Sequence, residues 1–183
     1  MPSPAASRIS VRKLLQRFRR NRRGSAAVEF ALIAPVFFAL LFAILESGLL
    51  FFADQTLESV AQNSARMILT GQAQSNGYDL SQFKAQYVCP TGSLAAILFN
   101  CANIYIDVQS YSTFSNVSLS SQIDANGNFI IPTNYSPGGP GQIVVVRFFY
   151  QWQLFVTGLG FNISNLTNGQ RLLVATVAFQ NEP

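Results

Sequence analysis

Residues 25–53 read SAAVEFALIAPVFFALLFAILESGLLFFA and contain no lysine or arginine. As an α-helix these 29 residues would be roughly 43 Å long, at about 1.5 Å of rise per residue. That length exceeds the hydrocarbon core of a bilayer, which is about 30 Å thick. Glu29 and Glu46 alone interrupt the apolar run, and their spacing places them near opposite edges of that core. The stretch predicts a membrane-spanning helix with an acid at each margin.

Basic residues gather before this helix. Eight of them precede Gly24 with no acid among them, whereas the rest of the chain has four basic residues and eight acids. Lysine and arginine beside a span stay on the cytoplasmic side. We therefore expect residues 1–24 to be a cytoplasmic leader, either a basic amphipathic helix over 8–23 on the inner leaflet or a disordered segment. The domain beyond the span has no basic patch, which argues against nucleic-acid binding.

The apolar run is too long for a secretory signal peptide, whose apolar region has about 7–15 residues. It also lacks a small-x-small cleavage site at its end, Leu50-Phe51-Phe52-Ala53-Asp54. We expect the span to remain in the mature protein.

Gly24 stands between the basic leader and the span. Glycine allows an extended chain that a membrane protease can reach. Cleavage after Gly24 would give Ser25 a new α-amine, a natural counter-charge for Glu29. The alternative is that Glu29 only snorkels to the interface, and the residues themselves leave both interpretations open.

The junction resembles a known processing site. Gly24, four small or apolar residues, Glu29-Phe30 and an uncharged apolar run are similar to the site of class III prepilin peptidases. Together with Glu46-x-Gly48 and Leu57-x-x-Val60-Ala61-x-x-x-Ala65-Arg66, the segment from 22 to about 70 resembles the TadE-like pseudopilins. These are accessory subunits of the tight-adherence (Flp, type IVc) pilus system. The last residues, Asn181-Glu182-Pro183, are similar to the ends of many such chains.

The resemblance implies a role for each of these residues. Gly24 and Ser25 become the scissile pair, and Glu29 becomes the acid at mature position five. Glu46 is expected to be a second membrane-embedded acid because of its place in the apolar run. The implied partners are prepilin peptidase, other pilin-like subunits, the tight-adherence machinery and membrane lipid. The implied location is the bacterial inner membrane, with a single pass, a cytoplasmic N-terminus and a periplasmic domain. Ser25 departs from type IVa and type II secretion pilins, whose mature chains begin with phenylalanine.

The helix is expected to continue outside the membrane over residues 54–71. Leu57, Ala61 and Ala65 keep a helical spacing on one apolar stripe, and Gly71 is a suitable C-terminal cap. Within the span 25–53, Pro35 removes one backbone hydrogen bond and predicts a kink.

Residues 72–183 predict an exoplasmic α+β domain. Short helices are expected near 79–84 and 92–100, and strands over 104–108, 129–131, 142–155 and 170–180. Cys89 and Cys101 are expected to form a disulfide, because the compartment outside the membrane is oxidising. The predicted fold is a long N-terminal transmembrane helix that continues outside the membrane and packs on a small antiparallel sheet, the type IV pilin-like architecture.

The chain offers little for catalysis. It contains no histidine, which excludes catalytic triads and the usual zinc sites, and it has no glycine-rich phosphate loop. We predict a non-enzymatic pseudopilin, processed after Gly24 and acting in Flp pilus assembly, with no catalytic, metal or cofactor residue and no small-molecule substrate. The alternatives are an uncleaved bitopic envelope protein whose periplasmic domain binds another envelope component, and an exoplasmic enzyme. The segment Phe155–Phe161 is expected to fill the core, with membrane or partner contact as alternatives.

Overall fold

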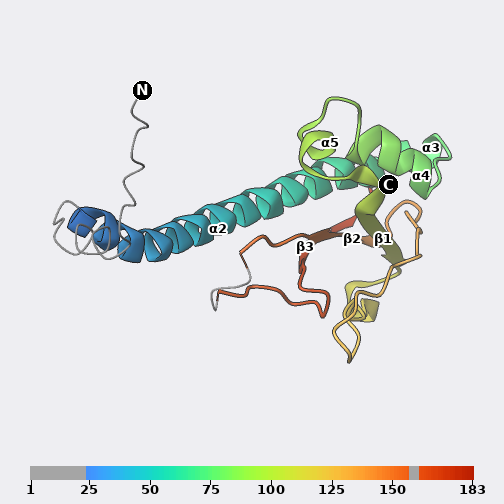
Figure 1. The fold of residues 1–183 in the computed structure, drawn as a ribbon. Helices are drawn as coiled ribbons and strands as arrows, with labels where there is room; N and C mark the ends of the chain where they lie inside the picture. Colours follow the sequence, from blue (N-terminus) through green and yellow to red (C-terminus); the bar gives the residue numbers. More distant parts are fainter. Residues whose placement is uncertain (1–23, 157–160) are drawn as a thin grey trace, which may run out of the picture. The chain divides into compact units, whose positions relative to one another are not determined.

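The apolar run forms part of one long helix in the structure, a computed structural model that describes residues 24–156 and 161–183. Helix α2 (Ser25–Leu69) has 45 residues and is not interrupted at Pro35 (Figure 1). By length and composition it could cross a membrane, with a mean hydropathy of 2.5 in its most apolar window. A kink at Pro35 stays a prediction.

The chain divides into two compact units, Met1–Phe42 and Ala43–Pro183. In the described part of the first unit, the large apolar side chains of α2 are exposed, among them Phe30, Leu32 and Phe37. This exposure on all sides suits a helix surrounded by lipid. The leader 1–23, with its expected amphipathic helix, lies outside the described residues.

The second unit contains a three-stranded antiparallel sheet in the order β1 (Ile104–Tyr111), β2 (Ile143–Trp152) and β3 (Arg171–Gln180). In its register Asp107 lies opposite Arg147, and Arg147 opposite Thr176. The central strand β2 is buried from Ile143 to Phe149. A long apolar helix followed by a small antiparallel sheet confirms the predicted α+β class.

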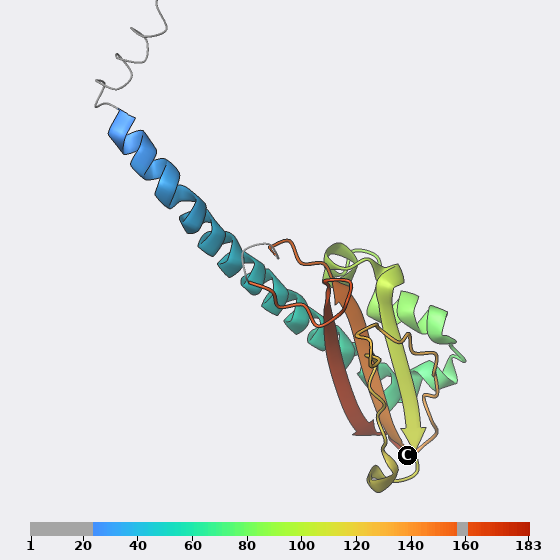
Figure 2. The ribbon, with the colours of Figure 1, turned by 60° about the horizontal axis from the view of Figure 1, so that its bottom comes forward.

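The outer half of α2 packs against one face of this sheet (Figure 2). Leu57, Ala61, Ala65 and Ile68 are all fully or almost fully buried, and they share one core with inward-facing residues of all three strands. These positions are three or four residues apart, so they form one stripe on the helix. The predicted apolar stripe is therefore confirmed, and its two alanines allow the helix to approach the sheet closely.

Short helices follow the end of α2. Gly71 has a φ of +72°, the left-handed conformation that commonly ends a helix. Asp79 begins the next expected helix through a capping box with Gln82. The elements of this region are α3 (Gln72–Ser75), α4 (Leu80–Phe83), the π-helix η2 (Lys84–Val88), α5 (Leu94–Leu98) and the 3₁₀ helix η3 (Cys101–Asn103). Cys89 and Cys101 are joined by a disulfide.

The strand expected at 129–131 is wrong. Phe129 forms only an isolated bridge with Ile123, and Ile130 and Ile131 are exposed. The side chain of Asp124 accepts hydrogen bonds from the amides of Asn126 and Asn128. These bonds stabilise a tight turn, and beyond it the amide of Ile130 donates to the carbonyl of Gln122 at 2.8 Å, a short pairing that does not extend into a strand within the described residues. The connection between β1 and β2 also includes the 3₁₀ helix η4 (Phe114–Asn116).

Candidate functional site

The expected processing junction lies at the start of α2. Gly24 is in a short 3₁₀ turn, and the α-helix begins at the next residue, Ser25. A Cβ atom added to Gly24 would have no heavy atom within 4 Å, so nothing in the described residues requires glycine there for packing. Glu29 is exposed on the same helix, one turn beyond Ser25.

The second acid of the span has a different environment. Glu46 is only 5% exposed, although it lies in the apolar run. Its carboxylate accepts hydrogen bonds from the backbone amides of Phe155 and Val156, the latter with N–O distances of 3.2 and 3.1 Å. The buried charge is therefore satisfied within the chain by two amides at the start of the β2–β3 connection.

The sequence did not reveal this contact, and the expectation for the connection was wrong in one respect. Phe155 was expected to fill the core, but its side chain is 76% exposed. The neighbouring Leu154 is the buried residue. Because Glu46 binds the two amides that follow Leu154, the backbone is fixed while the ring of Phe155 points away from the core. Residues 157–160 of the segment lie outside the described residues.

A buried ion pair lies on the sheet face opposite α2. Arg147 donates to the Asp107 carboxylate from Nε at 3.0 Å and from a terminal nitrogen at 2.5 Å, and both side chains are buried. The other terminal nitrogen donates to the carbonyl of Ser120 at 2.8 Å. Asn134 and Gln109 also donate to Asp107. Because its hydrogen bonds are used internally, this network holds the β1–β2 connection against the sheet instead of offering a ligand site.

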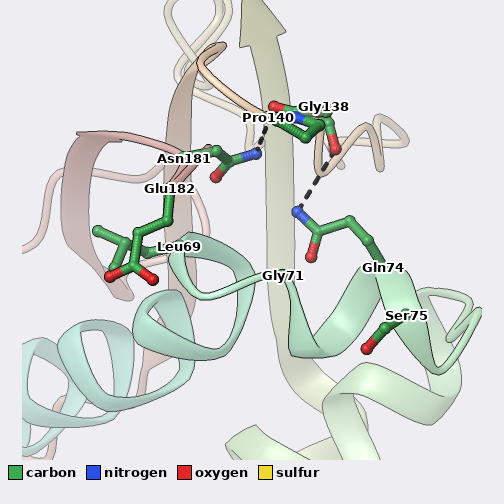
Figure 3. Close-up of a pocket in the computed structure, with 9 residues that line it drawn as sticks. Leu69, Gly71, Gln74, Ser75, Gly138, Pro140, Asn181 and Glu182 are labelled. Atoms are coloured by element: carbon green, nitrogen blue, oxygen red, sulfur yellow. Dashed lines mark hydrogen bonds between the residues drawn. The ribbon is translucent and has the colours of Figure 1, made fainter.

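A depression of about 350 Å³ lies where the C-terminal residues meet the end of α2. The side-chain amides of Gln74 and Asn181 both donate to carbonyls of the turn 137–139 (Figure 3). The backbone amide of Glu182 donates to the carbonyl of Leu69, the last residue of α2, at 3.0 Å. The depression is thus a junction between the helix end, the turn and the chain end.

Gly138 in that turn has no room for a side chain. Its φ is +69°, and an added Cβ would lie 2.9 Å from the Cβ of Ser110. The side-chain oxygens of Gln74 and Asn181 are buried and have no hydrogen-bond partner in the part of the chain that the structure describes. They have almost no accessible surface, so a ligand in the depression would not reach them.

Residues 24–66 match the model of a family described as TadE-like protein. This segment is TadE-like. No curated protein matches the chain, and no solved structure does. The match begins at Gly24 and ends within the buried stripe of α2, so it includes Glu29, Glu46 and the stripe residues Leu57, Ala61 and Ala65, but not Ile68.

The buried ion pair, the junction near the C-terminal residues and the disulfide lie outside the TadE-like segment. The described residues contain no group of three or more histidine, cysteine, aspartate or glutamate side chains that could hold a metal ion. The pKa shifts outside the span have local causes. The amide of Gln82 in the capping box lowers the pKa of Asp79, and burial raises the pKa of Tyr135 to about 12. Neither shift arises from paired acids of the kind that acid–base catalysis uses.

Proposed function

We propose that this TadE-like chain is a membrane-anchored pseudopilin, a minor pilin-like subunit that is cleaved after Gly24 and acts in the assembly of tight-adherence pili. The carrying observation is the family match over residues 24–66, which starts at the residue before the proposed scissile bond. Members of this family are pilus-associated structural proteins, so the proposed role is assembly and not catalysis. The partners would be prepilin peptidase, other pilin-like subunits and the assembly machinery.

The position of the junction supports cleavage. Gly24 lies in a short 3₁₀ turn and the α-helix begins at Ser25, so the proposed scissile bond lies at the start of the helix. The proposed orientation places residues 1–24 in the cytoplasm and the sheet domain in the periplasm, since the basic leader favours retention inside.

The geometry of the helix start supports a proposed function for Glu29 after cleavage. Cleavage would place a positive amine on Ser25 at the end of α2 where the helix dipole is also positive. Glu29 lies four residues later on the same face, about 6 Å along the axis. Its carboxylate would offset both positive charges, on its own subunit or on a neighbour, in surroundings where an unpaired charge is costly. Glu46 is already bound to two amides, which leaves Glu29 for this role.

The first test concerns cleavage. Gly24→Ala should leave the full-length precursor in the native membrane, measured as intact mass, because the peptidase site is lost. Gly48→Ala is the matched control, since a Cβ at either glycine would contact nothing within 4 Å. The control should be processed normally. If the wild-type protein keeps residues 1–24, the processing proposal is wrong, and an uncleaved envelope protein becomes the better description.

The second test separates cleavage from assembly. Glu29→Gln should still be cut, because the scissile bond lies a full turn away, but it should not support pilus formation. Glu29→Asp should be intermediate, since the charge stays on a shorter side chain. Pulse-chase labelling measures cleavage, and pilus counts on the same strains measure assembly. Normal pilus numbers with Glu29→Gln would refute the charge-pairing role.

A further inference from the structure

The start of the β2–β3 connection combines a fixed backbone with an exposed aromatic ring. The amides of Phe155 and Val156 donate to the carboxylate of Glu46, whereas the Phe155 side chain is among the most exposed apolar side chains of the described chain. An exposed phenylalanine held in place by a buried acid requires an explanation that core packing does not give.

We propose that Phe155 and the backbone around it form a second membrane contact, inserted into the outer leaflet beside α2, with phospholipid as the occupant of this surface. The inference rests on the membrane anchoring that the proposed function includes. It uses none of residues 157–160.

The position of Glu46 along α2 supports the insertion of Phe155 into the outer leaflet. A hydrocarbon core of about 30 Å covers about 20 helical residues, so a span that starts next to the basic leader ends close to Glu46. The backbone bonded to Glu46 lies at the same level. Asp54, the first charged residue after the run, lies about 12 Å farther along the helix. Phe155 therefore lies at the boundary between hydrocarbon and headgroups, the depth at which interfacial segments bury side chains such as phenylalanine and leucine.

The hydrogen bonds are those that a lipid environment demands. In a bilayer, backbone N–H groups without a partner cost several kcal/mol each, and a loop can enter only if its amides are satisfied by protein. Glu46 satisfies two of them, and they in turn satisfy its carboxylate. The carboxylate of Glu46 and the two backbone amides thus offset the free energy that each would lose by entering hydrocarbon without a hydrogen-bond partner.

The charge pattern points the same way. Residues 148–170 contain no Asp, Glu, Lys or Arg. The next charge, Arg171, lines a depression of about 340 Å³ together with Leu50, Phe51 and Asp54, farther from the hydrocarbon than Glu46. A cation at this level suits lipid phosphates.

Continuity with the span favours lipid over a protein partner. Leu45 and Leu49, within one turn of Glu46 on α2, are each about half exposed. They belong to the same apolar run that the bilayer would surround. A neighbouring subunit on Phe155 is the competing outcome, and the experiment distinguishes it.

The test places a single tryptophan in the full-length chain, with Trp152→Phe as the background because Trp152 is the only native tryptophan. Phe155→Trp is the reporter. Phe38→Trp reports the middle of the span, and Phe114→Trp reports an exposed site in η4 of the β1–β2 connection. Each variant is reconstituted into phosphatidylethanolamine–phosphatidylglycerol vesicles. Quenching is measured with aqueous iodide and with lipids brominated near the headgroup or near the chain end.

Phe155→Trp should show blue-shifted emission, stronger quenching by bromine near the headgroup than near the chain end, and a several-fold smaller iodide slope than Phe114→Trp. Iodide quenching equal to that of Phe114→Trp would overturn the inference while leaving the anchor intact, provided that deep bromine quenches Phe38→Trp. Protection from both iodide and bromine would also overturn it, because protein would then cover the ring. If no brominated lipid quenches Phe38→Trp, the proposed membrane anchor itself is wrong.

The role of Glu46 is tested in the same reporter. Glu46→Gln keeps one acceptor oxygen but loses the charge, so the Phe155→Trp iodide slope should rise toward that of Phe114→Trp. The quenching of Phe38→Trp by brominated lipid should not change, and this result would show that the span is still inserted. An unchanged Phe155→Trp slope would refute the positioning role of Glu46.

Discussion

The buried pair of Asp107 and Arg147 gives the sharpest stability prediction. Only 7% of the Arg147 side chain and 1% of the Asp107 side chain are exposed. Arg147 makes two of its hydrogen bonds to the same carboxylate oxygen. Arg147→Met keeps an unbranched apolar side chain but removes the guanidinium, so that among the described residues the Asp107 charge keeps only the neutral donors of Asn134 and Gln109. Losing one partner of a buried pair costs about 3–5 kcal/mol. Asp107→Leu should cost a similar amount, because it leaves the guanidinium unpaired.

The double variant Asp107→Leu/Arg147→Met should cost no more than about 2 kcal/mol, because replacing a whole buried pair by apolar side chains is often neutral. The two substitutions would then be coupled by at least about 4 kcal/mol, because the single costs of about 3 kcal/mol or more would together exceed the cost of the double variant by that amount. Urea unfolding of the full chain in detergent micelles, followed by the fluorescence of Trp152 on β2, measures all three variants. Thr176→Val is the control, since Thr176 lies opposite Arg147 in the register but is exposed. A cost of the double variant equal to the sum of the two single costs would refute the reasoning.

Three further predictions concern the unit that contains the sheet. Leu57→Ala should lower the unfolding free energy by about 2–5 kcal/mol, because it leaves a cavity between α2 and the sheet. Leu49→Ala, at a half-exposed site of the same helix, should change the unfolding free energy by less than about 0.5 kcal/mol. Similar costs for the two variants would contradict the packing. Tyr135 has a buried hydroxyl without a partner among the described residues, and burial raises its pKa from 10.0 to about 12. Because the unfolded tyrosine ionises first, wild-type stability should fall between pH 10 and 12, and Tyr135→Phe should remove that loss without destabilising the protein at neutral pH. Cys89→Ser should lower stability by about 3 kcal/mol, the value expected for closing a short loop, and thiol labelling of the native wild type should find neither Cys89 nor Cys101 reactive.

Local patterns in the sequence determined the helices and strands. The apolar run, its continuation as a stripe through Leu57 and Ala65, and the stop at Gly71 predict α2 to within a residue or two, because helical spacing and capping act over one turn. The three long strands follow in the same way from runs of β-branched and aromatic residues. The expected strand at 129–131 failed because a strand needs a partner, and the short pairing beyond the turn at Asp124 does not extend into one.

Only the tertiary structure decided which side chains meet across the chain. Glu46 and Phe155 are 109 positions apart, and Asp107 and Arg147 are 40 positions apart. The hydrophobicity of the segment indicated that Phe155 would be buried. Hydrophobicity does not determine which of the apolar side chains in a segment faces away from the core. The sequence likewise placed Glu29 and Glu46 at the two margins of one apolar run, without showing that their surroundings differ. They differ because the path of the β2–β3 connection brings two backbone amides to Glu46, and that path depends on contacts between distant residues that no local pattern records.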